Sequence, residues 1–137
     1  MRDILIYLIA LKQYIKQYHW LAKGYENHIL ADKLEDGLET EIDELAELIL
    51  ATDENTNIMA SELLQAASEK ILPSAQSGEM KQILQSIATM SGQILGMCKN
   101  TKPANELAEL AFADYLGRLS NSLLRKLYLI QIQYGKE

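Results

Sequence analysis

Apolar residues recur at intervals of three and four through most of the chain, and this periodicity constrains the fold more than any other feature. Over residues 3–20 the repeat places seven of them on one face: Ile4, Tyr7, Leu8, Leu11, Tyr14, Ile15 and Tyr18. An α-helix turns once every 3.6 residues, so this spacing predicts a helix with one buried side. The sequence has no valine, only two prolines and no long run of β-branched residues. We therefore predict an all-α protein.

Polar breaks divide the 137 residues into four long helices and one short one. We expect the long helices over residues 3–20, from 25–28 to about 52, from 77 to about 98, and from about 104 to 132. The short helix lies between the second and third long ones, where it can carry the chain along the bundle. With no internal repeat or linker, residues 1–137 are expected to form a single domain with a ferritin-like four-helix bundle.

Local signals give more detail about these helices. Gly37 falls inside the second long helix, where a glycine costs about 1 kcal/mol relative to alanine. The short helix contains Leu63, Leu64 and Ile71, is limited by Pro73, and is capped by Asn55, Thr56 or Asn57; Ser77 caps the next helix. The buried side of the last helix is expected to include Leu107, Leu110, Phe112, Leu116, Leu119, Leu123, Leu127 and Ile130.

Charge and cysteine content exclude several classes of function. Thirteen basic residues against nineteen acidic ones give a net charge of -6, without a Lys/Arg block at either end, so direct nucleic-acid binding is not expected. The lone Cys98 excludes an internal disulfide framework and fits a reducing compartment, with the thiol acting as a small buried residue. The apolar run Ile4–Leu11 is too short to span a bilayer and lacks a signal-peptide cleavage site. We expect a cytoplasmic protein without a membrane partner.

Residues 19–47 contain both histidines and nine of the nineteen acidic residues. A continuous helix would turn by about 100° per residue, which would place a polar stripe beside the apolar one. The polar stripe consists of His28, Asp32, Glu39, Asp43 and Glu47. Successive acids four residues apart repel by about 0.2–0.5 kcal/mol per pair, and a bound cation could offset that repulsion. Glu35, Glu41 and Glu44 are expected on the solvated face.

The spacing His28-x3-Asp32-x10-Asp43-x3-Glu47, preceded by His19-Trp20 and Lys23-Gly24, resembles the signature of the Dps family of mini-ferritins. The likeness is close over residues 19–47, and the order of helices extends it over the chain. The connection Gly24–Asn27 is shorter than in typical Dps proteins, and short ferritin-like proteins of some phage genomes share this tighter spacing.

The resemblance implies a di-iron site across a twofold subunit interface, with two symmetric sites per dimer. Its ligands would be divided between two chains: His19, His28, Asp32, Asp43 and Glu47. Trp20 would stand beside the site as an electron donor, while Lys23, Asp36 and Glu39 would orient the ligands. Fe(II) would be oxidised by hydrogen peroxide or dioxygen, giving iron storage or peroxide detoxification, and zinc could substitute for iron. The implied assembly is a homo-oligomer, from a dimer up to a shell of twelve subunits.

Other interpretations stay open at this point. His28 and Asp32 could be a surface hydrogen-bonded pair, His19 could complement the end of its helix, and Trp20 could belong to a core or an interface. The chain would then be a structural or interaction bundle with a vestigial or absent metal site. A DNA-protecting role is weakest, because no basic tail precedes the first helix. The absence of any Glu-x-x-His argues against the ferritin site built within one chain.

Overall fold

The computed structural model describes residues 1–52, 58–71, 80–102 and 106–134, and these residues form helices without any strand, which confirms the all-α class. Six helices lie in the described ranges: α1 (Arg2–Leu21), α2 (Tyr25–Glu35), α3 (Leu38–Thr52), α4 (Ala60–Glu69), α5 (Met80–Asn100) and α6 (Glu106–Tyr134). The predicted caps Asn55–Asn57 and Ser77, together with Pro73, fall outside the described residues, and Met59 occupies the N-cap position of α4.

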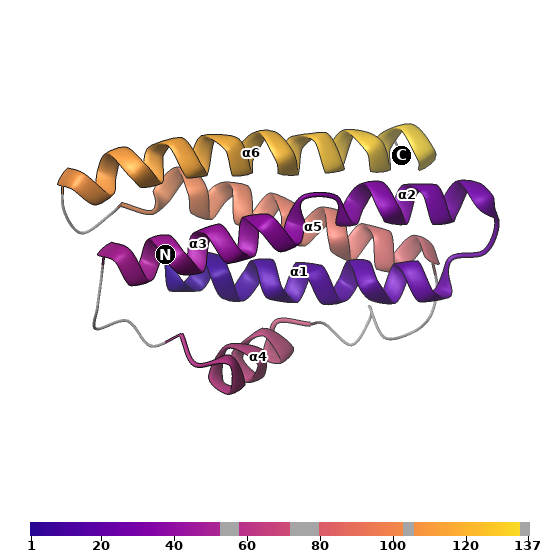
Figure 1. Ribbon diagram of the computed structural model, residues 1–137. Coiled ribbons are helices and arrows are strands. Elements are labelled where there is room, and N and C mark those ends of the chain that lie inside the picture. Colours follow the sequence, from indigo (N-terminus) through magenta and orange to yellow (C-terminus); the bar gives the residue numbers. More distant parts are fainter. Residues whose placement is uncertain (53–57, 72–79, 103–105, 135–137) are drawn as a thin grey trace.

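The long helices run side by side, and α4 lies across one side of them (Figure 1). Helix α1 runs from one end of the bundle to the other, and α2 and α3 return to the first end. Helix α4 then carries the chain back toward the end at which α2 begins. As a result, α5 runs parallel to α2 and α3, and α6 runs antiparallel to α5. The short helix therefore occupies the crossover position expected from the sequence.

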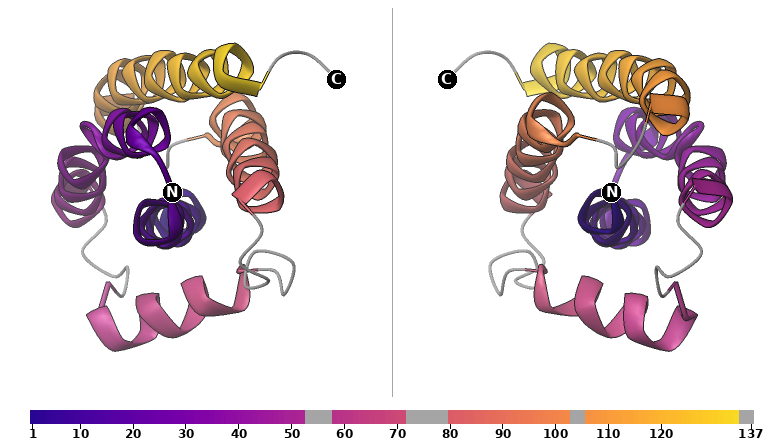
Figure 2. Two further views of the ribbon diagram at one scale, coloured as in Figure 1. Left: turned by 90° about the vertical axis from the view of Figure 1, so that its right-hand side faces the viewer. Right: turned by 90° about the vertical axis from the view of Figure 1, so that its left-hand side faces the viewer.

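The core lies between α1, the α2–α3 pair, α5 and α6. Seen end-on in Figure 2, α1 has α3 on one side, α5 on the other and α4 beneath it, while α6 lies across the far side. Helix α1 contacts α2, α3, α4 and α5, and α6 contacts α2, α3 and α5. Because α1 is covered on so many sides, Ile4, Leu8, Leu11 and Ile15 are completely buried, as the apolar repeat predicts. Met90 also fills the core.

The predicted continuous helix over residues 25–52 is wrong, because the chain breaks at Asp36 and Gly37. Gly37 has a φ of 78°, a conformation that residues with a Cβ rarely adopt, and Asp36 is extended at φ -57° and ψ 126°. The Asp36 N–H still donates to the Asp32 carbonyl (3.1 Å), and the Glu41 N–H donates to the Gly37 carbonyl (2.9 Å). The polar stripe drawn on one continuous helix is therefore split between α2 and α3.

Two leucines at the start of α6 also differ from the prediction. Leu107 and Leu110 are exposed, whereas Ala108, Phe112 and Tyr115 face the core. The sequence has apolar residues on both sides of α6, and the side that packs against α3 and α5 is the one that carries Phe112. Ile71 lies beyond the end of α4, and Leu127 and Ile130 are half-buried. The lone Cys98 is half-buried, and burial raises the pKa of its thiol.

Replacing Gly37 by alanine should lower the free energy of unfolding by about 1–2 kcal/mol, because a Cβ at positive φ is strained. That Cβ would also lie 3.3 Å from Oε1 of Glu41. Gly92→Ala is the matched control: Gly92 is helical and its added Cβ would meet no atom within 4 Å, so we expect stabilisation of up to about 1 kcal/mol. Urea unfolding of both variants measures the difference. Two effects of the same sign would contradict this explanation of the helix break.

Candidate functional site

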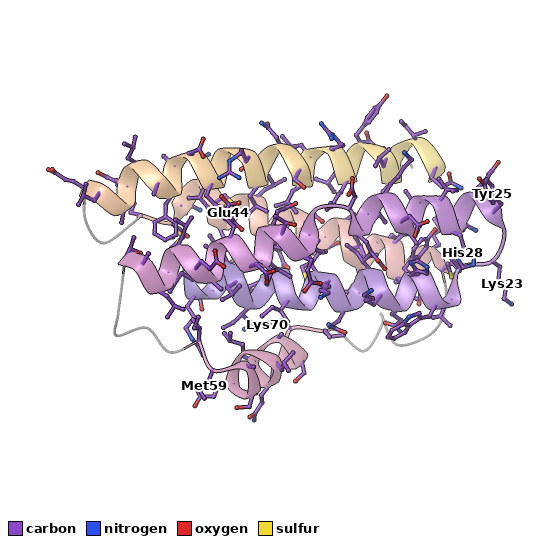
Figure 3. All side chains as sticks on the ribbon, in the orientation of Figure 1. Lys23, Tyr25, His28, Glu44, Met59 and Lys70 are labelled. Atoms are coloured by element: carbon purple, nitrogen blue, oxygen red, sulfur yellow. The ribbon has the colours of Figure 1, made fainter. Side chains whose placement is uncertain are left out.

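The two histidines meet where α1 turns into α2. His19 lies in the last turn of α1 and His28 in the first turn of α2, and Gly24, with φ 87°, reverses the chain between them. Their ring centroids are 5.6 Å apart, with the rings edge to face at 76°. Figure 3 shows His28 near this end of the bundle, with Lys23 and Tyr25 at the connection. Both imidazoles are therefore available at one place on the surface.

Two carboxylates complete this group. His19 Nδ1 lies 3.1 Å from Glu35 Oε1 and 3.6 Å from Asp32 Oδ1. Lys16 Nζ lies 3.5 Å from the other Glu35 oxygen. We call His19, His28, Asp32 and Glu35 the His19 cluster. Glu35 was expected to be solvated, yet it is half-buried against His19. Its position three residues after Asp32 and seven after His28 puts it on the same side of α2, a signal that could have identified it.

Asp43 and Glu47 lie away from the His19 cluster. Both are exposed on α3, beyond the break, and α3 leads away from the end that holds His28 (Figure 1). Positions fifteen residues apart along helices with a rise of 1.5 Å are separated by about 20 Å. His28 and Asp43 of one chain therefore cannot bind the same ion. Three of the five predicted ligands, His19, His28 and Asp32, therefore lie together, and the other two lie on α3, away from them.

The residues expected to assist the site have mixed surroundings. Trp20 is 73% exposed, next to His19 in sequence, and Lys23 is exposed. Glu39 forms an ion pair with Lys12 of α1, and that hydrogen bond and charge lower the pKa of Glu39. The acid stripe is therefore partly neutralised by α1, which the sequence did not reveal. Asp36 has an exposed side chain at the helix break.

A second polar group holds the break between α2 and α3 against α6. The buried Lys126 ammonium donates to the Asp36 carbonyl (3.0 Å), and Ser122 Oγ donates to Glu41 Oε1 (2.8 Å). Tyr115 Oη donates to the Glu41 carbonyl (2.7 Å). Burial raises the pKa of Glu41 and lowers that of Lys126. A hollow of about 210 Å³ opens beside Lys126 and Ser122.

Four bases and one acid line this hollow, and two of the bases, Arg118 and Lys126, are held by groups of the α2–α3 pair. Arg118 forms a two-pronged ion pair with Glu44 (2.5 and 2.9 Å) and also contacts Asp114 (3.1 Å). Figure 3 shows Glu44 on α3 beside α6. Arg118 therefore has acidic partners both on α3 and on its own helix. These contacts fix α3 against α6, and they set the direction in which Asp43 and Glu47 project from the bundle.

No family model matches this chain, and no curated protein or solved structure is similar enough to count as a match. Within the described ranges, no three His, Cys, Asp or Glu side chains of one chain are grouped so that they could hold a metal ion. The helices that the structure describes include none with the length and apolarity needed to cross a membrane. Fold and site therefore define an all-α protein with two histidines and two acids clustered at one helix connection.

Proposed function

We propose that this protein is a Dps-like iron-binding protein with a ferritin-like bundle, in which the His19 cluster of one chain meets Asp43 and Glu47 of a twofold partner. The observation that carries the proposal is the contact of both histidine rings with each other and of His19 with two carboxylates. Imidazole nitrogen and carboxylate oxygen are the donors that ferrous iron and zinc accept. The cluster offers such donors, but it is only half of a binding site.

The other half comes from α3 of the partner. Asp43 and Glu47 are exposed and four residues apart, so their carboxylates lie on one face of α3. They are too far along the bundle to reach His28 of their own chain. A twofold axis would bring each pair of acids to the other chain's histidines and generate two identical sites. This arrangement is consistent with the absence of a complete metal-binding group in the described part of a single chain.

Iron would be the substrate of this site. Two ferrous ions each give one electron to hydrogen peroxide, which takes up two protons, breaks its O–O bond and leaves as two water molecules. With dioxygen as oxidant, the same two electrons and two protons yield hydrogen peroxide. The carboxylates stabilise the additional positive charge of ferric iron. Trp20, exposed and adjacent to His19, would supply an electron when the oxidant accepts only one from iron.

The test is oxidation of Fe(II) by the purified protein. Fe(II) is added anaerobically, peroxide follows, and ferric absorbance is recorded for wild type, Asp43→Ala and the control Glu69→Ala, an exposed acid on α4. We expect wild type and the control to oxidise iron at the same rate and Asp43→Ala to fall to the rate of buffer. Rates at buffer level in all three proteins would reject the proposed activity.

A structural or interaction bundle is the second candidate. It is favoured by the contacts that His19 and Lys16 make with Glu35, because these pairs satisfy the acid without any metal. Metal analysis after mild purification separates the two candidates. Stoichiometric iron or zinc in wild type, lost in His28→Ala, would exclude the structural candidate. Metal-free protein that also fails to take up added Fe(II) would favour it.

A further inference from the structure

Helix α6 has a regular outer stripe that the described fold does not use. The 29-residue helix packs through Ala108, Phe112, Tyr115, Leu119 and Leu123. Its outer face has a second series of residues, which we call the outer stripe: Leu107, Leu110, Asp114, Gly117, Asn121, Leu124, Tyr128 and Gln131. Every member is exposed, and the steps between them alternate between three and four. This alternation is the heptad spacing of helices that pair along a seam.

The apolar members of the outer stripe are large and open. Leu107 is 88% exposed, Leu110 79%, Leu124 55% and Tyr128 60%. Single exposed leucines are common on protein surfaces. The exposed apolar residues of α6 instead occupy positions at both ends of one heptad series, so their distribution is not the scattered one of ordinary surface leucines. Ile132, also exposed, borders the stripe beside Gln131. Four of the eight members are therefore large apolar residues, and Asp114, Asn121 and Gln131 are its polar members.

We propose that the outer stripe of α6 pairs antiparallel with the outer stripe of a second copy of this chain. The distribution of charge on α6 selects both the partner and the direction. The exposed acids Glu106, Glu109 and Asp114 lie in its first third, and the exposed bases Arg118 and Arg125 follow. Antiparallel pairing brings Asp114 of one helix beside Arg125 of the other, and Glu106 and Glu109 then face the uncharged last turns of the partner helix. Parallel pairing would place like charges together.

Antiparallel pairing also aligns the heptad positions of the two outer stripes. With the twofold axis at the level of residue 119, Leu110 faces the partner's Tyr128, and Leu107 faces the partner's Gln131. Asp114 faces the partner's Leu124, beside the partner's Arg125. Each pairing occurs twice, as an interface between identical surfaces requires. The Asp114 carboxylate is already 3.1 Å from Arg118 Nε of its own chain, which offsets its charge within the stripe.

Gly117 supports the same register. A glycine inside a helix costs about 1 kcal/mol relative to alanine. In the single chain, a Cβ at Gly117 would meet no atom within 4 Å, so packing inside the bundle does not require glycine there. In the antiparallel pair, Gly117 faces the partner's Asn121, next to the axis. The missing side chain leaves room for that amide and lets the two helices approach closely.

The size of the contact suits a weak, reversible dimer. Twenty-nine residues at 1.5 Å each give a seam about 43 Å long, and a helix pair is in contact over a width of about 10 Å. The pair therefore buries roughly 400–450 Å² on each chain, about 800–900 Å² in total, which is below the roughly 1,000 Å² of a stable specific interface and in the range of a transient one. This interface is separate from the one proposed for the metal site, because it uses α6 and none of the His19 cluster, Asp43 or Glu47.

Sedimentation over a range of concentrations tests the interface. Leu110→Gln/Leu124→Gln should raise the dissociation constant of self-association at least about tenfold, since it removes apolar contacts near the seam. Leu64→Gln, on the exposed side of α4, is the matched control and should have no effect. Circular dichroism and urea unfolding check that the exposed substitutions leave the fold intact. Equal association of all three proteins, or a wild type that stays monomeric at every concentration, would overturn the proposal.

Disulfide trapping tests the direction of pairing. In a Cys98→Ser background, Leu110→Cys chains are mixed with Tyr128→Cys chains and oxidised. We expect disulfide-linked heterodimers in the mixture and none when either variant is oxidised alone. Efficient linking of Leu110→Cys to itself would show parallel helices and contradict the proposal. Metal binding is measured on the same samples: loss of association with metal affinity retained, or the reverse, separates failure of this interface from failure of the proposed metal site.

Discussion

A His28→Ala variant is expected to bind zinc or ferrous iron at least a hundredfold more weakly than wild type. His28 is one of only two imidazoles in the chain. Its ring lies 5.6 Å from that of His19, centroid to centroid. Even residues that only orient metal ligands typically change affinity by about 10–100-fold, so loss of a ligand should cost at least the upper value. Competition with a chromophoric chelator measures the affinity directly.

Thermal unfolding gives a second readout of the same substitution. A metal that binds only the folded state at about 100 times its dissociation constant adds about 2.7 kcal/mol of stability, which wild type should gain and His28→Ala should not. Tyr25→Ala, an exposed aromatic of the same helical turn, is the control and should behave like wild type. Affinity should fall at lower pH, because protons compete with the metal for imidazoles and carboxylates. Unchanged metal affinity in His28→Ala would show that the histidine pair does not form a metal site.

The second large effect is expected at Lys126. Lys126→Met removes the charged hydrogen bond to the Asp36 carbonyl and the positive charge that faces Glu41. Loss of a buried charged hydrogen bond of this kind costs about 2–3 kcal/mol, so unfolding at pH 7 should become easier by that amount. Lys99→Met, an exposed base in the last turn of α5, is the control and should change stability by less than about 0.5 kcal/mol.

The pH dependence of this effect follows from the pKa of Glu41, which burial raises above its ordinary value of 4.5. A carboxyl whose folded-state pKa is raised contributes stability that is fully present below pH 4.5 and is lost as the pH rises through the folded-state pKa. Protonated Glu41 has less need of a nearby cation. The destabilisation by Lys126→Met should therefore be smaller at pH 4.5 than at pH 7. An equal or larger effect at pH 4.5 would contradict the electrostatic role of Lys126.

The sequence predicted the helices better than it predicted the break at Gly37. Apolar spacing identified the buried side of α1 because it depends only on neighbours within a few turns. A glycine within a helical pattern can either stay helical, at about 1 kcal/mol, or adopt positive φ. Contacts from α6 favour the second outcome: Lys126 binds the carbonyl of Asp36, and Tyr115 binds that of Glu41. These partners are 90 and 74 residues away in sequence, so local spacing does not reveal them.

The candidate site was also predicted in part. The spacing of His28 and Asp32 on one helix fixes their common face, whereas the meeting of His19 with Glu35 depends on the path of the α1–α2 connection. The ion pair of Lys12 with Glu39 likewise depends on how α1 packs against α3. Side-chain spacing within one helix can be read from the sequence, but contacts between helices need the packing that the structure supplies.

Mixing two inactive variants tests the shared metal site most directly. His28→Ala chains lose one ligand of the histidine half and Asp43→Ala chains lose one ligand of the acidic half, so neither variant alone has an intact site. When the two variants are co-expressed in equal amounts, half of the twofold pairs contain one chain of each kind. Each of these mixed pairs regains one of its two sites. The mixture should therefore bind metal and oxidise Fe(II) at about a quarter of the wild-type level. A mixture no more active than the separate variants, beside an active wild type, would contradict a site built from two chains.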